Sequence, residues 1–134
     1  MLTLNVFSPE KKVLEGRRVS AVTLPGTEGQ IQILPGHAAM VGALETGVMS
    51  YQVEGEGLAM AAISTGFFEV ANDQATLTVE TIELSGEVDV ERAKRAQAKA
   101  EKMLQDAALD PSQFRKYELK LQRAIIRQQT VAGV

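Results

Sequence analysis

The amino-acid sequence predicts an α+β protein, in which an N-terminal antiparallel β-sandwich over residues 1–85 is followed by a C-terminal antiparallel two-helix hairpin over residues 86–134. Three observations support this fold class. Apolar and polar residues alternate with a period of two in the first half. Ten of the 11 glycines lie between Gly16 and Gly86. After Gly86 the chain changes to alanine and long polar side chains, which are strong helix formers.

The first half contains three clear strand patterns. They are LTLNVF at 2–7, QIQIL at 30–34 and ATLTVETIEL at 75–84, the last with a phase slip before Ile82. Alternation of this kind is typical of a strand with one buried and one solvated face. Glycines and prolines separate short apolar runs by about 8–12 residues, the spacing of an antiparallel sandwich or barrel. Asn72-Asp73 stands between two alternating runs and predicts a hairpin turn.

The second half predicts two helices. Asp89 is suited to cap the first helix, and Asp110-Pro111 to begin the second. The apolar stripe of the first helix is expected at Ala93, Ala96, Ala100, Met103 or Leu104, and Ala107. The stripe of the second is expected at Phe114, Tyr117, Leu121, Ala124 or Ile125, and Gln128. A short connection makes the helices antiparallel neighbours. Because alanines bury little area, at about 25 cal/mol per Å², we expect a tail that is only marginally held in place.

Composition excludes several kinds of chemistry. The chain has no cysteine and a single histidine, His37, which excludes disulfides, thiolate catalysis and a histidine-cluster metal site. There is no run of about 18 apolar residues to span a bilayer. The N-terminus places its apolar residues before its charges, which is the wrong order for a secretory signal and predicts a cytoplasmic location.

The net charge of −3 is divided unequally along the chain. Residues 1–84 contain four Lys and Arg against ten Asp and Glu, whereas residues 85–134 contain ten against seven. This asymmetry indicates two units that face different partners. A basic helix is a generic nucleic-acid signal, but the acidic first half and the lack of Trp argue against a nucleic-acid partner.

Three segments of the chain carry a family resemblance. They are LPGTEGQIQILPGHAAMVGALETGVM at 24–49, STGFFEVANDQATLTVE at 64–80 and EVDVERA at 87–93. In this order, and followed by a helical hairpin, they resemble the epsilon subunit of F-type ATP synthases over essentially the whole chain.

This resemblance implies a non-catalytic subunit that works in the rotor stalk. The sandwich would bind the gamma subunit and the ring of c subunits. The hairpin would either fold down or extend toward the catalytic beta subunit and its alpha neighbours, where it blocks ATP hydrolysis. The subunit would be peripheral to the cytoplasmic face of a bacterial plasma membrane, and the stromal face of a thylakoid stays open as an alternative.

The resemblance also implies a nucleotide site at the start of the first helix. VDVERA at 88–93 matches the family's motif there and includes Asp89 and Arg92. Glu83 occupies the position of an acidic residue that precedes the motif. Lys99 stands where ATP-binding members usually have arginine, which keeps the charge but loses bidentate phosphate geometry. Asp89 alone is better explained as a helix cap, whereas with the family motif the cap and the ligand role are equally supported and can hold together.

Arg123 and Arg127 match the family's pair of arginines on the second helix. They are four residues apart and share one helical face. Facing Arg92 and Lys99 across the hairpin, they would repel those cations unless an anion lay between them, and a triphosphate would supply that anion. ATP is therefore expected as a regulatory ligand, and no cofactor is required.

The second helix is basic along much of its length. Its cations are Arg115, Lys116, Lys120, Arg123 and Arg127. They suit an acidic protein segment, which in the resembled family belongs to the catalytic beta subunit, and such pairing would weaken as salt rises.

Two alternatives stay open from the sequence. The apolar residues at 38–41 belong either to the core or to an exposed patch that faces the c ring. The chain is either a stalk subunit or, from a different class, a free-standing ATP-sensing interaction module. His37 is interpreted as a structural residue, because no serine or aspartate partner completes a catalytic triad with it.

Overall fold

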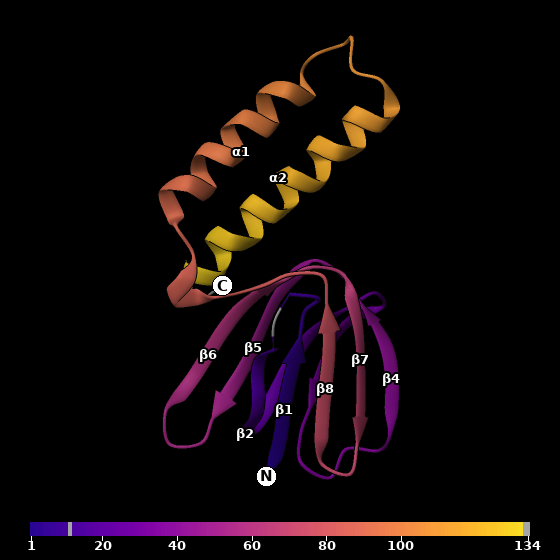
Figure 1. Cartoon of the computed structure of the whole chain (residues 1–134), viewed down its shortest axis with the longest axis vertical. Coiled ribbons are helices and arrows are strands. Elements are labelled where there is room, and N and C mark those ends of the chain that lie inside the picture. The colour runs from indigo at the N-terminus through magenta and orange to yellow at the C-terminus, as the bar shows by residue number, and fades with distance from the viewer. Residues whose placement is uncertain (11, 133–134) are drawn as a thin grey trace.

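A computed structural model describes residues 1–10 and 12–132, and it consists of a β-domain from which two helices project as a hairpin (Figure 1). The strands are β1 (Leu2–Phe7), β2 (Lys12–Gly26), β3 (Gly29–Ile33), β4 (Met40–Leu44), β5 (Gly47–Val53), β6 (Gly57–Ile63), β7 (Gly66–Ala71), β8 (Gln74–Val79) and β9 (Ile82–Leu84). A short 3₁₀ helix, η1 (Ser85–Glu87), leads to the helices α1 (Val90–Leu104) and α2 (Pro111–Ala132). The predicted fold class, a sandwich followed by a helical hairpin, is confirmed.

The long strand β2 joins the two layers of the sandwich. Hydrogen-bonded strands run in the order β1-β8-β7-β4-β2-β5-β6-β9, and β1 also pairs with β2. The first part of β2 pairs with β1, where Val19 faces Leu2, and its last part pairs with β3, where Leu24 faces Ile31. The strand pairs are antiparallel except β1 and β8, which run parallel.

The core lies between the two layers and follows the predicted alternation. In β1 the residues Leu2, Leu4 and Val6 are buried, while their neighbours are partly exposed. The same alternation is found in β8, where Leu77 and Val79 are buried, and after a break the core continues at Ile82 in β9. The period of two in the sequence therefore identified the inward faces of these strands.

The turn between β7 and β8 confirms the predicted hairpin. Asn72 and Asp73 both have positive φ, 52° and 57°, which is the geometry of the two-residue turns that suit the twist of a hairpin. The carboxylate of Asp73 accepts a hydrogen bond from the backbone N–H of Gly36 at 2.6 Å, and its carbonyl accepts one from Thr3 at 2.9 Å. This turn thus also holds the neighbouring loop and the start of β1.

Both helices begin where their capping residues predict. The carboxylate of Asp89 accepts a hydrogen bond from the N–H of Arg92 at 3.0 Å, and that of Asp110 accepts one from Gln113 at 2.8 Å. The end of α1 differs from the expectation, because the helix stops at Leu104 and Ala107 is exposed in the connection. Within that connection the carboxylate of Asp106 accepts a hydrogen bond from the N–H of Ala108 at 2.9 Å, a local turn that competes with a further helical turn.

Small side chains line the contact between the two helices. Ala93, Ala100 and Ala124 are almost fully buried there. The side chains of Gln128 and Gln97 share a hydrogen bond of 2.6 Å across the helices. Phe114, expected on the stripe, is 43% exposed, because α1 ends before it covers the first turns of α2.

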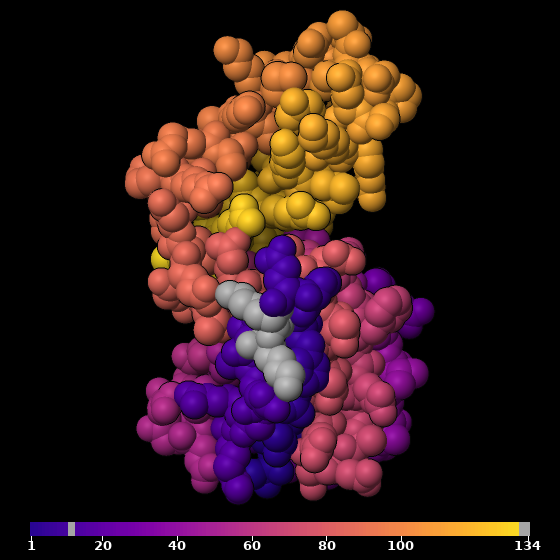
Figure 2. Space-filling model, viewed as in Figure 1, coloured from indigo at the N-terminus to yellow at the C-terminus, as the bar shows by residue number. Residues whose placement is uncertain are grey.

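The hairpin stands on the sandwich by one end. The last turns of α2 contact β5, β6 and η1, while the connection between the helices lies far from the strands (Figure 1). Figure 2 shows the side chains of the hairpin meeting the sandwich along this end alone, on the face in view. Most of the hairpin surface is therefore free to meet ligands or partners.

Residues 38–41 form an exposed patch and are not part of the core, which decides between the two alternatives left open by the sequence. Met40 is 38% exposed and Val41 74% exposed, and the two alanines before them are also exposed. His37 is partly buried, and its Nδ1 lies 2.7 Å from the carbonyl oxygen of Ala38. Among the residues described, no helix has the length and apolar character needed to cross a membrane.

Candidate functional site

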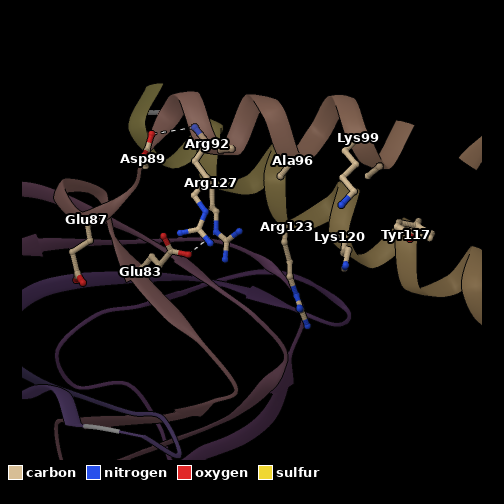
Figure 3. Close-up of a pocket in the computed structure, with 12 residues that line it drawn as sticks. Glu83, Glu87, Asp89, Arg92, Ala96, Lys99, Tyr117, Lys120, Arg123 and Arg127 are labelled. Atoms are coloured by element: carbon tan, nitrogen blue, oxygen red, sulfur yellow. Dashed lines mark hydrogen bonds and ion pairs between the residues drawn. The ribbon is translucent and has the colours of Figure 1, made fainter. Parts of the chain in front are cut away.

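A cleft of about 470 Å³ opens between the two helices above β9 (Figure 3). Its size falls within the range of small-molecule binding pockets. The lining residues are Glu83, Glu87, Asp89, Arg92, Ala93, Ala96, Lys99, Ala100, Tyr117, Lys120, Arg123 and Arg127. The small alanine side chains of α1 leave the space, and charged side chains surround it.

One end of the cleft lies next to the sandwich and mixes acidic and basic groups. Glu83 is brought there by β9 and Arg127 by the end of α2, and the Nε of Arg127 donates a hydrogen bond to the Glu83 carboxylate at 2.5 Å. Asp89 and Arg92 stand at the start of α1, held by the cap hydrogen bond between them. Figure 3 shows the two arginines together above Glu83, with Glu87 nearby.

The other end of the cleft is cationic. Lys99 comes from the middle of α1 and Lys120 from α2, and Tyr117 lies beside them (Figure 3). Arg123 lies between the two ends along α2. Within the described part of the chain no carboxylate forms an ion pair with any of these three cations.

The six residues predicted for a nucleotide site all line this one cleft. They are Glu83, Asp89, Arg92, Lys99, Arg123 and Arg127. Of the cations predicted to face an acidic partner, Lys120 also lines the cleft, whereas Arg115 and Lys116 are exposed outside it. Arg115 instead lies 4.0 Å from Glu118 on its own helix.

Sequence reasoning did not place Glu87, Tyr117 or Lys120 in the cleft. A signal for Lys120 was present, because it precedes Arg127 by seven residues and therefore shares its helical face. Tyr117, three residues before Lys120, lies on the same helical face. Glu87 lies in η1, whose 3₁₀ turn was not foreseen.

The chemistry of the cleft suits an anion that also carries hydrogen-bond donors. Five cations face three carboxylates, so the cleft has a net positive charge. Arginine and lysine bind phosphate oxygens by charge-assisted hydrogen bonds, and carboxylates accept from amino groups. No cluster of His, Asp and Glu able to hold a metal ion is found in residues 1–10 and 12–132.

The fold and the cleft define a class of protein in which a β-sandwich carries a helical hairpin with a basic cleft. Comparison with known proteins makes the family specific. Residues 1–85 match the model of the ATP synthase delta/epsilon chain β-sandwich domain, and residues 87–132 match that of its long α-helix domain. The chain belongs to the ATP synthase delta/epsilon chain family, as the resemblance in the sequence indicated.

Relatives cover nearly the whole chain. The ATP synthase epsilon chain of Trichlorobacter lovleyi is 41% identical over 132 residues, which are 98% of this chain and 94% of that protein. The epsilon chain of Geotalea daltonii is 42% identical over 132 residues, which are again 98% of this chain and 94% of that protein. A similar fold occurs in the Euglena gracilis mitochondrial ATP synthase, solved with its OSCP, F1 and c-ring, where 98% of this chain superposes on 80% of a chain with a TM-score of 0.83 and 23% identity.

Proposed function

We propose that this chain is a non-catalytic subunit of the central stalk of a proton-translocating F-type ATP synthase. In this role it couples the rotor to the catalytic head and inhibits ATP hydrolysis through its hairpin. The observation that carries the proposal is the full-length match to bacterial ATP synthase epsilon chains at about two-fifths identity. Its bacterial relatives support a peripheral position on the cytoplasmic face of a plasma membrane.

The sandwich is the proposed anchor on the rotor. Phe67 on β7 and Val41 on β4 are 69% and 74% exposed, and they line a shallow apolar depression together. Large apolar side chains gathered at a surface are typical of protein contacts. We assign this surface to the gamma subunit and the c ring.

The hairpin is the proposed inhibitory element. Its helices are joined by an alanine seam, and it meets the sandwich at one end, so its release costs little buried area. The exposed cations Arg115 and Lys116 on α2 suit an acidic segment of the catalytic beta subunit. The structure has the hairpin packed on the sandwich, and an extended form would reach the head.

ATP is the proposed regulatory ligand of the cleft. The nucleotide would place its triphosphate among the cations of both helices and so stabilise the packed hairpin against the extended one. Calorimetry with ATP on the full chain is expected to show binding, and Arg127→Ala is expected to weaken it. Identical traces for the two proteins would mean that the cleft residues serve the structure alone.

Reconstitution with a matching catalytic head tests the inhibitory role. The full chain is expected to lower the rate of ATP hydrolysis by a head that lacks this subunit. Removal of residues 86–134 is expected to relieve the inhibition while gamma binding, measured by co-purification, is kept. If neither protein changes the rate, the proposal is wrong.

One observation favours a second function. Every residue that lines the cleft lies between Glu83 and Arg127, so all of this lining comes from one segment of this chain. The chain would then be a free-standing ATP-sensing module that reports to another partner. Tight ATP binding without association with any gamma subunit would favour this alternative over a stalk subunit.

A further inference from the structure

We propose that Lys120, held in place by Tyr117, acts with Lys99 as the part of the cleft that recognises the terminal phosphate of a nucleoside triphosphate. The inference rests on the proposed binding of ATP to this cleft. It assigns these residues as the determinants of selectivity for a triphosphate over a diphosphate.

The cations of the cleft form two tiers along the hairpin. Arg92 and Lys99 are seven residues apart on α1, and Arg127 and Lys120 are seven apart on α2. Because the helices are antiparallel, Arg92 lies at the same end as Arg127, and Lys99 at the same end as Lys120 (Figure 3). Seven residues correspond to about 10 Å along a helix axis. An extended ligand is therefore needed to contact both tiers.

The two tiers differ in charge. At the tier next to the sandwich, Arg127 is already paired with Glu83 at 2.5 Å, and Glu87 and Asp89 lie in the same wall. At the outer tier the cleft contains Lys99 and Lys120, and none of the described residues that line it there is a carboxylate.

This difference orients the nucleotide. The carboxylates at the inner tier are suited to accept hydrogen bonds from the amino group of a base. The phosphates would then extend toward Lys99 and Lys120, which form no ion pair with a described carboxylate. Arg123, between the tiers, is placed for the inner phosphates, and the last phosphate reaches the outer tier.

Tyr117 holds Lys120 at this outer tier. The Nζ atom of Lys120 lies 5.4 Å from the centroid of the Tyr117 ring, within the range of a cation–π contact. The ring is itself part of the cleft wall and only partly exposed. A flexible lysine that rests on a fixed ring loses less freedom when a phosphate binds, so the ring preorganises the site.

Lys116 provides a matched control within the same helix. Its Nζ atom lies 5.9 Å from the same ring, and the residue does not line the cleft. Substitution of either lysine by glutamine removes one positive charge from α2. Only Lys120 is expected to matter for the terminal phosphate.

Calorimetry of the full chain with ATP, ADP and AMP at constant salt tests the inference. In Lys120→Gln, ATP affinity is expected to fall about tenfold, the effect of one charge-assisted hydrogen bond, while ADP and AMP affinities stay nearly constant. Lys99→Gln is expected to behave in the same way, Tyr117→Leu to show a smaller loss for ATP, and Lys116→Gln to leave all three affinities unchanged.

Other outcomes would contradict either the assignment of Lys120 or the ATP site itself. If the unsubstituted chain binds ATP and Lys120→Gln keeps the ratio of ATP to ADP affinity, the assignment of Lys120 is wrong and the proposed ATP site stands. An equal loss for all three nucleotides, or an equal effect of Lys116→Gln, means a general charge effect and also overturns the assignment. If the unsubstituted chain binds no nucleotide, both the ATP site and this inference are wrong.

Discussion

The guanidinium of Arg127 on α2 and the carboxylate of Glu83 on β9 form an ion pair of 2.5 Å that ties the hairpin to the sandwich. The two residues are 44 positions apart in the chain, and both side chains are about one-third exposed. The pair stands at the end of the cleft next to the sandwich, so the group that holds the hairpin down is also a group that a phosphate would contact. Docking of the hairpin and binding of an anion are therefore expected to influence one another.

Glu83→Gln tests the contribution of this pair to hairpin docking. We expect the free energy of unfolding to fall by about 1 kcal/mol or less, since a partly solvated pair is screened by water. Amide hydrogen exchange in the last turns of α2 is expected to rise, because those turns contact the sandwich. In the control Glu91→Gln, which removes an exposed carboxylate 3.8 Å from Lys94 within α1, exchange at the end of α2 should stay unchanged. Equal exchange in both variants would contradict a role in docking.

Much of the fold followed from local patterns in the sequence. Alternation in β1 predicted which side chains are buried, because a strand places successive side chains on opposite faces. Asp89 and Asp110 predicted the two helix starts, and Asn72-Asp73 predicted a turn, because each depends on hydrogen bonds or dihedral angles within a few residues. These features need no knowledge of distant segments.

The order of the strands and the full lining of the cleft, which the sequence did not predict, depend on distant segments. The parallel pairing of β1 with β8 joins Thr3 to Gln74, and no local pattern indicates which strands become neighbours. The same reason applies to the cleft. Lys120 was interpreted as part of an exposed basic face, and its place opposite Lys99 follows from how α2 packs on α1. The motif residues were found by family resemblance instead, which carries such long-range information.

Ala124→Leu tests whether the alanine seam sets the spacing of the helices. Ala124 has no exposed surface, so a larger side chain must push α2 away from α1 at a cost of about 1–3 kcal/mol. Thermal unfolding followed by circular dichroism should show the hairpin melting earlier than the sandwich. The control Ala98→Leu adds the same atoms on an exposed position of α1 and is expected to be nearly neutral. Equal destabilisation in both variants would mean that leucine at any position of the hairpin is disfavoured.

Gly66→Ala tests the close approach of β7 to β8. A Cβ atom on Gly66 would collide with the carbonyl oxygen of Thr78 and lie 2.8 Å from the Cα of Val79. Both are backbone atoms of the paired strand and cannot turn aside, so we expect the free energy of unfolding, measured in urea, to fall by about 1–3 kcal/mol. Gly86→Ala, whose Cβ would lie within 4 Å of none of the described residues, is expected to unfold at nearly the same urea concentration as the unsubstituted chain. A stable Gly66→Ala protein would show that β7 can shift along its neighbour.

Tyr51 makes the stability of the sandwich sensitive to high pH. Burial on β5 raises the pKa of its hydroxyl above the ordinary value of 10.0, Arg17 lowers it in part, and Glu56 raises it. The raised pKa means that the folded protein keeps the proton when the unfolded chain has lost it. The contribution of Tyr51 is therefore fully present below about pH 10 and is lost as the pH rises through the higher pKa of the folded state.

Tyr51→Phe removes this proton and is expected to flatten the fall of stability at high pH. Urea unfolding midpoints, measured from neutral pH to above pH 10, should decline less steeply for this variant than for the unsubstituted chain. Other groups that titrate in this range are common to both proteins, so their effect cancels in the comparison. Parallel curves for Tyr51→Phe and the unsubstituted chain would mean that the hydroxyl of Tyr51 reaches solvent as readily in the folded state as in the unfolded one.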